Sequence, residues 1–594
     1  MTMQETLQQA IEHHQSNQLQ EAEKLYRAIL AQAPDHPDAN HNLGVLAMQV
    51  NKPEVALSFF EKAIQVNPEH PQYQQSLKNA KAKLEQSPLV ISQDMDNRLV
   101  SLFTQQKYEE VLRLAREAVE KDPDYAFGWK VVGTIEFMMK DYTNALPHYK
   151  KALRLNPQDA EVHCNLGAVL QDLGRLEESE ASCRQAIRLK PDLAEAHNNL
   201  SDTLRDLGRL EESEASSREA IRLKPDYAKA HNNLGNALIE LGRLKESEAS
   251  YRQAIRLKPD LAEAHNNLGN ALIELGRLEE SKASYRQAFH LKQDFNSVIE
   301  NLMSLNIQLN IQEKMPSFAE NNLMAKIYLI IYLFINKLFK EIEPLIYELK
   351  KDTYQHLYMQ LNAKNKVFFD AYLGFLSKLN GIALGQENQL ITTEKENILY
   401  HIGESHCLSF AHQTVKLNDQ KYTVKPLIIF GAKAWHFANQ EKKSFLAFFE
   451  NHIRQLPIKA KVIVSFGEID TRENEGIIEY HLKSGKDLKF IVKKTIDGYI
   501  EYTQNIINRR NIEAYYMGVP APVIKDSDEN KQLRIEVVKE FNKYLSFVLK
   551  KHDLKFIDTY KLTVNNQGSS NLKYMIDNRH LHPNLLSRLF EFSE

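Results

Sequence analysis

The sequence predicts a multidomain chain with two fold classes: an all-α superhelix of stacked helix pairs, followed by an α/β domain with a doubly wound parallel sheet. Three observations predict this division. Residues 3–295 repeat themselves with a period of 34 residues, and the period then stops. Residues 396–594 alternate short β-branched runs with amphipathic stretches. A chain of 594 residues is also too long for one hydrophobic core.

The period is visible in the prolines Pro157, Pro191, Pro225 and Pro259, each 34 residues after the last. This frame predicts two repeats at 3–36 and 37–70, and six more at 92–125, 126–159, 160–193, 194–227, 228–261 and 262–295. Residues 71–91 break the phase and predict a connecting helix.

Each recurring position of the repeat has a physical role. A glycine such as Gly174 ends the first helix with a positive φ, and the proline ends the second helix. Small residues at the helix crossings allow close packing, and no repeat can bury its apolar face without its neighbours. The period and these positions resemble tetratricopeptide (TPR) repeats, a resemblance that implies a scaffold holding a protein or peptide in its groove.

Asparagine recurs at one position of the first helix of the repeat. The members of this asparagine row are Asn42, Asn165, Asn199, Asn233 and Asn267. An amide both donates and accepts, so a row of amides can bind a peptide backbone of any sequence. The row resembles the asparagine ladder of O-linked N-acetylglucosamine transferase, although nothing after residue 295 resembles that enzyme's catalytic region. The alternative is that these asparagines bond to adjacent helices and serve only the repeat itself.

Residues 296–395 lose the period, and we expect them to form a capping helix and bridging helices without a cluster of chemical groups. In residues 396–594, apolar runs at 398–403, 426–431, 461–467, 512–520 and 554–560 predict strands. Helical stretches lie between them, for example 534–551. Strands that alternate with helices predict a parallel sheet covered on both faces, with ligands beyond the carboxyl ends of the strands.

Four motifs lie at or near those strand ends. They are Gly403-Glu404-Ser405-His406, Phe430-Gly431-Ala432, Phe466-Gly467-Glu468-Ile469-Asp470-Thr471-Arg472 and Asp577-Asn578-Arg579-His580-Leu581. Their order resembles the SGNH (GDSL-like) hydrolase superfamily, over about residues 396–594. The resemblance implies that Ser405 is the nucleophile, His580 its general base and Asp577 the carboxylate that orients the base. It also implies that the backbone N–H groups of Ser405 and Gly431 bind the oxyanion.

The sequence departs from that family at two positions. Glu404 replaces an aspartate, and Ile469 stands where the family has an asparagine that donates to the oxyanion. Losing such a donor typically costs about a hundred- to a thousandfold in rate. Gly467, Asp470 and Arg472 are candidates for shaping the pocket, while Glu468 with Arg472 could equally be a structural ion pair.

The resemblance implies a serine esterase or acyltransferase acting on an acylated small molecule or glycan, without a cofactor. A different interpretation is a non-catalytic interaction scaffold with a degenerate hydrolase-like domain. A third is a metal-dependent phosphoesterase using His580 and His582, although we expect no metal site. No phosphate loop or dinucleotide-binding motif is present in the sequence.

Composition and local sequence patterns limit the kinds of partner and the cellular compartment that we expect. The net charge of −3 gives no general attraction to nucleic acid. The three cysteines have no metal-type spacing and suit a reducing compartment. The most apolar stretch, 327–339, is shorter than the roughly 20 residues that span a bilayer. With no secretory signal pattern in MTMQETLQQA, we expect a cytoplasmic protein without a membrane span.

Overall fold

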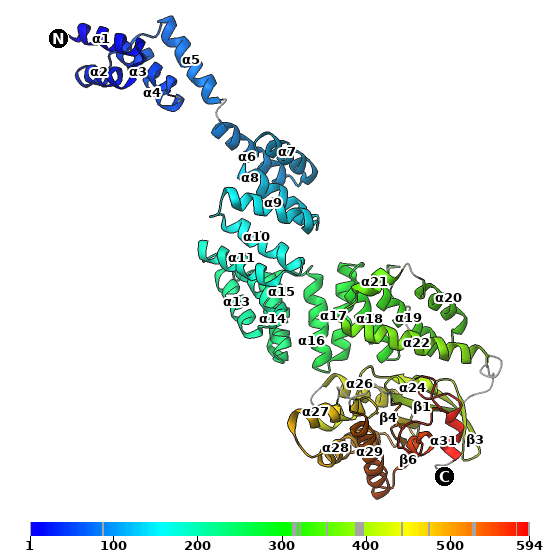
Figure 1. Ribbon diagram of the computed structural model, residues 1–594. Coiled ribbons are helices and arrows are strands. Elements are labelled where there is room, and N and C mark those ends of the chain that lie inside the picture. Colours follow the sequence, from blue (N-terminus) through cyan, green and yellow to red (C-terminus); the bar gives the residue numbers. More distant parts are fainter. Residues whose placement is uncertain are drawn as a thin grey trace. The chain divides into compact units, whose positions relative to one another are not determined.

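A computed structural model describes residues 2–50, 52–85, 88–311, 316, 318–319, 322–351, 354–385, 397–440, 443–472, 476–524, 530–577 and 579–591. The chain divides into two compact units, Met1–Leu207 and Gly208–Glu594 (Figure 1). The predicted boundary at residues 395 and 396 lies outside the described residues.

The first unit consists of paired helices. Its elements are α1 (Met3–Gln15), α2 (Leu19–Gln32), α3 (Pro37–Gln49), α4 (Pro53–Val66), α5 (Pro71–Glu85), α6 (Pro88–Thr104), α7 (Tyr108–Lys121), α8 (Ala126–Met138), α9 (Tyr142–Leu155), α10 (Ala160–Asp172), α11 (Leu176–Leu189) and α12 (Ala194–Asp206). Two helices fall in each predicted repeat. The out-of-phase segment holds α5 and the start of α6, which begins at Pro88 rather than at residue 92.

Glycine in the first helix of a repeat makes room for a large side chain of the second. A Cβ on Gly44 would lie 2.6 Å from the Phe60 ring, and one on Gly133 would lie 3.1 Å from the Tyr149 ring. Both rings are buried. The helix pairs therefore pack closely because a small residue faces an aromatic one.

The second unit begins with further paired helices and continues into the bridging helices. They are α13 (Leu210–Leu223), α14 (Ala228–Glu240), α15 (Leu244–Leu257), α16 (Ala262–Glu274), α17 (Leu278–Leu291), α18 (Asn296–Gln308), α19 (Leu323–Ile335), α20 (Phe339–Leu349), α21 (Gln355–Gln360) and α22 (Ala363–Gly385). Helix α18 lies in the segment for which a capping helix was expected.

The α/β region of the second unit is built on one six-stranded sheet. The strands are β1 (Asn397–Gly403), β2 (Thr414–Leu417), β3 (Gln420–Ile428), β4 (Lys461–Ser465), β5 (Glu513–Met517) and β6 (Lys555–Ile557). Their order is β2-β3-β1-β4-β5-β6. All neighbours are parallel except β2 and β3, which are antiparallel. The sheet is therefore mixed, and the expectation of an all-parallel sheet was wrong at this edge.

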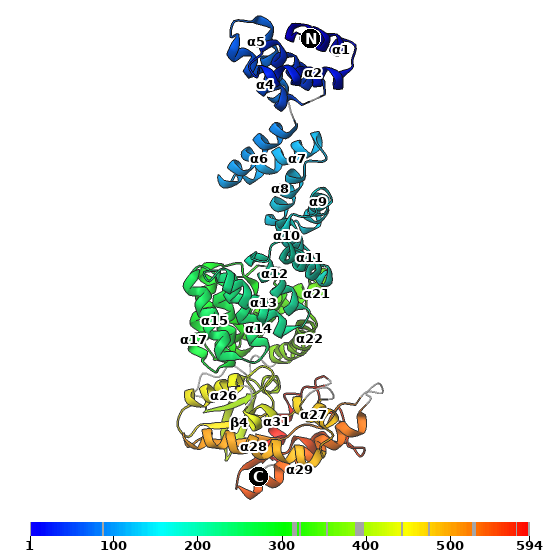
Figure 2. The same cartoon turned by 90° about the vertical axis from the view of Figure 1, so that its left-hand side faces the viewer.

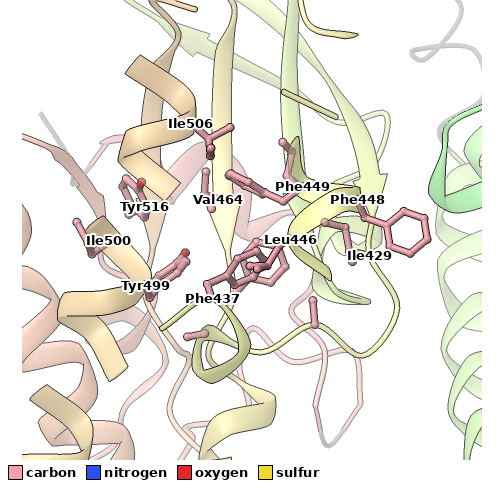
Figure 3. Packing of buried hydrophobic residues seen from close by; sticks show 14 of the residues in the cluster. Ile429, Phe437, Leu446, Phe448, Phe449, Val464, Tyr499, Ile500, Ile506 and Tyr516 are labelled. Carbon is pink, nitrogen blue, oxygen red and sulfur yellow. The ribbon is translucent and has the colours of Figure 1, made fainter. Parts of the chain in front are cut away.

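Helices and loops complete the region between and after the strands. They are α24 (His406–Ser409), α25 (Ala434–Asn439), α26 (Lys443–Gln455), η2 (Ile469–Thr471), α27 (Gly476–Ser484), α28 (Leu488–Asn508), α29 (Lys531–Lys551), α30 (Thr559–Thr563) and α31 (Leu585–Glu591). Figure 3 shows one face of the sheet, where Val464 and Tyr516 pack with Phe437 of α25, Phe449 of α26 and Tyr499 of α28. The opposite face packs against α31.

The last repeat helices share a core with the α/β region. One buried cluster joins Tyr285 of α17 and Leu302 of α18 to Phe448 of α26. Figure 2 shows α17 next to α26. Gln308 also accepts a hydrogen bond of 3.2 Å from the backbone N–H of Phe430, just after β3. Repeats and α/β region are therefore one continuous hydrophobic structure within this unit.

The bridging helices form a second cluster against the loop after β1. Phe375 of α22 and Ile331 of α19 belong to the same cluster as Cys407 and Leu408 of α24. By length and composition, α22 is a candidate membrane span among the described residues, but buried core helices have the same character. Several of its apolar residues, among them Phe375 and Leu376, pack in this cluster.

Candidate active site

Ser405 lies where the order of the parallel strands reverses. Strand β1 pairs with β3 on one side and with β4 on the other, and Ser405 follows directly after its carboxyl end. Crevices at such points are the usual ligand sites of open α/β sheets. The close pairing of β1 and β4 requires Gly403, because a Cβ there would collide with the side chain of Ser465.

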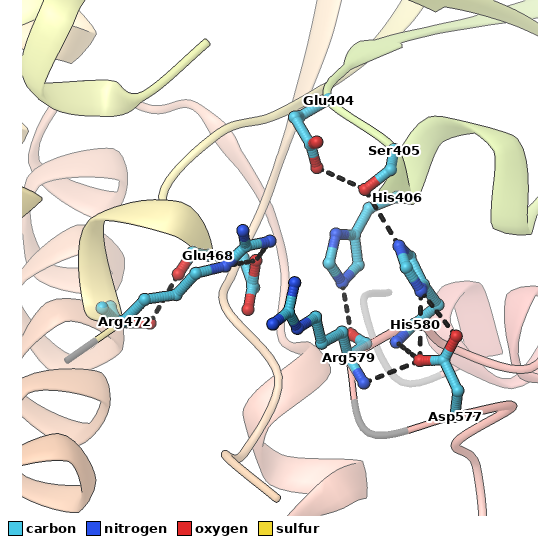
Figure 4. A network of polar contacts seen from close by, with 9 residues as sticks. Glu404, Ser405, His406, Glu468, Arg472, Asp577, Arg579 and His580 are labelled. Carbon is cyan, nitrogen blue, oxygen red and sulfur yellow. Dashed lines mark hydrogen bonds and ion pairs between the residues drawn. The ribbon is translucent and has the colours of Figure 1, made fainter. Parts of the chain in front are cut away.

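Ser405, His580 and Asp577 form a continuous chain of hydrogen bonds (Figure 4). The Ser405 Oγ lies 2.9 Å from Nε2 of His580, and His580 Nδ1 lies 2.8 Å from Oδ2 of Asp577. A tight loop holds the last two residues together, closed by a 2.8 Å bond from the N–H of Ile576 to the carbonyl of His580. The three residues that the sequence singled out are thus in mutual contact.

The carboxylate of Asp577 fixes the proton on the imidazole. Burial opposes its charge, but hydrogen bonds from His580 and from the N–H groups of Arg579 and His580 lower the pKa of Asp577 well below its usual range. An ionised Asp577 only accepts, so Nδ1 of His580 must carry a proton. In the neutral ring, Nε2 is then the acceptor that faces Ser405.

Glu404 also contacts the serine hydroxyl. The Ser405 Oγ lies within hydrogen-bond distance of Oε2 of Glu404 as well as of His580 (Figure 4). One hydroxyl proton cannot be donated to both acceptors at once. Glutamate in place of aspartate is one methylene longer, which allows its carboxylate to turn back to the neighbouring serine.

A buried ion pair lies next to the triad. Arg472 donates to Glu468 at 2.6 Å, and both side chains are at most one-fifth exposed. Burial opposes the charge of Glu468, yet the nearby Arg472 and His406 lower its pKa to about 2. His406 is buried, a position that lowers its pKa, and its Nε2 donates to the carbonyl of Arg579 at 2.7 Å. These contacts link the loop after β1 to the loop that carries His580.

Helix α22 forms one wall of the site. The ring of Phe375 stacks on the imidazole of His580 with a centroid distance of 3.7 Å and an interplanar angle of 12°. Lys378 donates to the carbonyl of Ile576 at 3.0 Å and so anchors the loop before Asp577. The sequence predicted bridging helices without a cluster of chemical groups, and it did not indicate that α22 packs against the loop that carries His580. No periodicity signal distinguishes such a wall from an ordinary buried helix.

Helix α22, Ser405 and His580 line a cavity of about 180 Å³. Its lining residues are Lys364, Val367, Phe368, Ala371, Tyr372, Phe375, Glu404, Ser405, Arg472, Arg579 and His580. Arg472 was a predicted pocket residue and lines this cavity. The sequence pointed to none of the residues from α22.

The other predicted pocket residues lie elsewhere. Asp470 is buried and accepts hydrogen bonds from the N–H groups of Ala434 and Trp435 at 2.7 and 3.1 Å, so it caps α25. Gly467 borders a separate small cavity of about 20 Å³, together with Ile469. Gly431 has a φ of +72° in the turn after β3 and lines neither cavity.

Two members of the asparagine row donate to the first helix of the preceding repeat. Asn267 donates to the side-chain oxygens of Asn232 and Asn236 at 3.1 and 3.0 Å. In the first unit, Asn199 donates to the carbonyl of Cys164 at 3.3 Å. Asn233 is buried and Asn165 half-buried. These bonds match the use of the row inside the repeats, which was one of the two sequence interpretations.

The histidines near the C-terminus are engaged with protein groups. His580 binds Asp577 and Ser405, and His582 accepts at Nδ1 from the N–H of Asn584 at 3.2 Å. Among the described residues, no group of three or more His, Cys, Asp or Glu side chains could hold a metal ion.

Comparison with known families identifies the repeats. Models described as TPR repeat match residues 133–174 and 235–276, and models described as tetratricopeptide repeat match residues 13–84, 158–226 and 262–295. All these matches lie within residues 13–295.

Individual proteins each match a part of this chain. Protein FlbA of Caulobacter vibrioides is 30% identical over 160 residues, which is 27% of this chain and 23% of FlbA, so the match spans about a quarter of that relative. Among solved structures, a thermophilic TPR protein of Thermus thermophilus is 25% identical, with 29% of this chain and 95% of that one covered and a TM-score of 0.28. YrrB, a TPR protein with an unusual peptide-binding site, is 19% identical (31% and 95% covered, TM-score 0.25). PilW, a type IV pilus biogenesis factor, is 20% identical (34% and 93% covered, TM-score 0.31). The chain therefore contains an all-helical tetratricopeptide-repeat scaffold, joined to a C-terminal α/β region with a mixed sheet.

Proposed function

We propose that this protein is a serine esterase or acyltransferase of the SGNH type whose repeats recruit a partner polypeptide. The observation that carries the proposal is the hydrogen-bonded chain Ser405–His580–Asp577 at the carboxyl end of β1. A serine hydroxyl is a weak nucleophile until a positioned imidazole accepts its proton. Here the imidazole is oriented by an ionised carboxylate and stacked on Phe375.

The reaction follows from these roles. Ser405 Oγ attacks the ester carbonyl while Nε2 of His580 takes the hydroxyl proton. The C–O bond to the alcohol then breaks, and His580 returns that proton to the leaving alcohol. In hydrolysis, water attacks the acyl-serine while His580 accepts a proton from it. The bond between the acyl carbon and the Ser405 oxygen then breaks, the acid leaves, and His580 returns the proton to Ser405. In transfer, a second alcohol takes the place of the water.

The hydrogen-bond donors that would stabilise the oxyanion are the weaker part of the site. The resemblance assigns two donors, the N–H groups of Ser405 and Gly431. Ile469 supplies no side-chain donor, and the loss of one such donor lowers the rate of comparable enzymes about a hundred- to a thousandfold. We therefore propose a slow enzyme rather than a fast one.

The size of the cavity bears on the substrate. At about 180 Å³ it is smaller than the pockets of roughly 300–1,000 Å³ that enclose drug-sized ligands. A short acyl group fits such a space, while the remainder of a small molecule or glycan stays outside. A protein or peptide held by the repeats could carry or deliver this ester, in the cytoplasmic setting expected from the sequence.

A fluorophosphonate probe tests the nucleophile on the full-length protein. We expect covalent labelling in the wild type and in Ser409→Ala, a control in α24, and no labelling in Ser405→Ala. His580→Ala should slow labelling by at least about a thousandfold, the scale seen when one triad member is removed. All variants should be compared by circular dichroism and urea denaturation to establish that they are folded.

The second candidate is a non-catalytic scaffold. Two observations favour it: Glu404 competes for the Ser405 proton, and Ile469 replaces a donor. A folded wild-type protein without Ser405-dependent labelling, and without turnover of 4-nitrophenyl butyrate, would establish this candidate and exclude the esterase.

A further inference from the structure

Positive charge collects around the cavity beside Ser405. Lys364, Arg472 and Arg579 line it, against the single carboxylate of Glu404. Arg472 is held in place by Glu468. Lys364 and the guanidinium of Arg579 have no carboxylate within ion-pair distance among the residues that the structure describes. Within the part of the chain that the structure describes, two cations without a carboxylate partner therefore border the cavity that Ser405 lines.

Tyr372 adds a buried donor without a partner. Its side chain lines the cavity and is 5% exposed, and its hydroxyl makes no hydrogen bond within the described part of the chain. Burial and the nearby Glu404 raise the pKa of this phenol well above its ordinary value, so the hydroxyl keeps its proton. A buried hydroxyl without a partner destabilises the protein, and a bound acceptor would remove that cost.

The remaining wall is apolar. Phe368 stacks on Tyr372 with ring centroids 4.4 Å apart, and Phe375 covers His580. Lys364 and Arg579 are exposed at the edge of the cavity, so they attract an anion from solution and salt screens that attraction. The cavity thus combines a short apolar space with a donor and cations.

We propose that this cavity binds an ester that carries a carboxylate, with the carboxylate bound by the Arg579 guanidinium and the Tyr372 hydroxyl. The proposal rests on the proposed function for its reaction, but not for its binding. The carboxylate can belong to the acyl group or to the alcohol. A planar guanidinium and a phenol both donate in the geometry that carboxylate oxygens accept.

Turnover by the full-length protein tests the proposal with matched pairs of esters. For the acyl side, 4-nitrophenyl hydrogen succinate is compared with 4-nitrophenyl butyrate. For the alcohol side, 4-acetoxybenzoate is compared with its methyl ester. In at least one of these two pairs, we expect kcat/KM to be at least about tenfold higher for the ester that carries the carboxylate than for the neutral ester at low salt. The difference should be smaller at high salt. Arg579→Gln and Tyr372→Phe should each reduce this ratio severalfold, whereas Arg454→Gln on α26 should not change it.

A binding measurement keeps the two proposals separate. Isothermal titration of folded Ser405→Ala compares monomethyl succinate with dimethyl succinate, so no chemistry is needed. We expect the monoanion to bind at least about tenfold more tightly, and Arg579→Gln in the same background to remove the difference. Anion-selective binding without Ser405-dependent labelling would retain this inference and overturn the esterase. Turnover with equal kcat/KM in both pairs, together with equal binding of the two succinates, would overturn this inference and leave the esterase intact.

Discussion

Between the carboxylate of Glu404 and the imidazole of His580, the Ser405 hydroxyl has two acceptors and one proton. If the Ser405 proton points to Glu404, His580 can form a hydrogen bond with Ser405 only by donating a proton from Nε2 to the serine oxygen. In that arrangement His580 cannot act as the base. Catalysis needs the opposite arrangement, with the proton directed to Nε2. The identity of residue 404 therefore sets the fraction of molecules that are ready to react.

We expect Glu404→Gln to raise the rate of fluorophosphonate labelling about three- to tenfold, which corresponds to roughly 0.7–1.4 kcal/mol. The amide of glutamine can donate to the serine oxygen and so leave its proton for His580. Glu404→Asp should act in the same direction because its shorter side chain no longer reaches the hydroxyl. A fall in rate with both variants would contradict this account and would assign Glu404 a positive role.

The Glu468–Arg472 pair makes a separate prediction about pH. The pKa of Glu468 is lowered to about 2 in the folded protein, from an ordinary value of 4.5. The stabilisation is therefore complete above about pH 4.5 and is lost as the pH falls toward about 2. Glu468→Gln removes the carboxylate that pairs with Arg472 in a mostly buried position. We expect it to lower the free energy of unfolding by about 3 kcal/mol at pH 7.

Urea denaturation at several pH values measures this effect. The difference between wild type and Glu468→Gln should shrink steadily from pH 5 to pH 3. Glu479→Gln is a control, since Glu479 is in a surface pair with Lys483. A difference that stays constant across this range would mean that the glutamate acts through packing and not through its charge.

Some residues of the candidate site could be predicted from the sequence and others could not. Ser405, Asp577 and His580 could be predicted from the sequence because each lies in a short motif at a loop and the motifs occur in a known order. Tyr372 and Phe375 lie in an apolar helix and differ in no local way from core residues. Their role depends on which loop the helix packs against, and periodicity carries no such information.

At the scale of elements, the repeats were predictable because one pattern recurs. A departure from the pattern in one copy matters little when the other copies keep it. Strand β2 was missed, although a signal for it exists. Asn418 and Asp419 both have positive φ, 49° and 61°, and form the two-residue turn between β2 and β3. Asparagine and aspartate tolerate that conformation, which suits a tight hairpin. The four-residue strand before this turn is too short to give a clear alternation of its own.

The asparagine row gives a prediction at the same scale. Both bonds donated by Asn267 of α16 go to α14, in the preceding repeat. Asn267→Ala leaves the oxygens of Asn232 and Asn236 with fewer donors, and we expect a loss of about 1–3 kcal/mol in the free energy of unfolding. Thermal and urea denaturation of the full-length protein would measure it. An unchanged stability, combined with weaker capture of a bound peptide, would instead favour the peptide-clamp interpretation.

At the scale of the whole second unit, the triad depends on helices that precede the sheet. Phe375 and Lys378 come from α22, and the core under β3 includes side chains of α17 and α18. A fragment that begins at residue 396 would expose Cys407, Leu408 and the other residues that α19 and α22 cover. Assays of activity therefore belong on the full chain, because an inactive fragment would say nothing about the site.

The contact between the repeats and the α/β region can be tested with a matched pair of glycines. Gly242 and Gly276 end equivalent helices with φ of +74° and +75°, so alanine costs a similar backbone strain of about 1 kcal/mol at both. A Cβ on Gly242 meets nothing within 4 Å, whereas one on Gly276 lies 3.2 Å from Ala447 and 3.3 Å from the carbonyl of Lys443 on α26. The difference between the two variants isolates the contact with the α/β region.

We expect Gly276→Ala to lower the free energy of unfolding of this unit by about 1 kcal/mol more than Gly242→Ala, because the tight contact must give way. Trp435 lies on α25 in this unit, and Trp129→Phe removes the only other tryptophan, so fluorescence during urea denaturation follows this unit alone. If the repeats rest on α26 in solution, Gly276→Ala should also slow fluorophosphonate labelling more than Gly242→Ala, since α17, α18 and β3 share one core. Equal effects of the two substitutions on stability would mean that the repeats do not press on α26 at this turn.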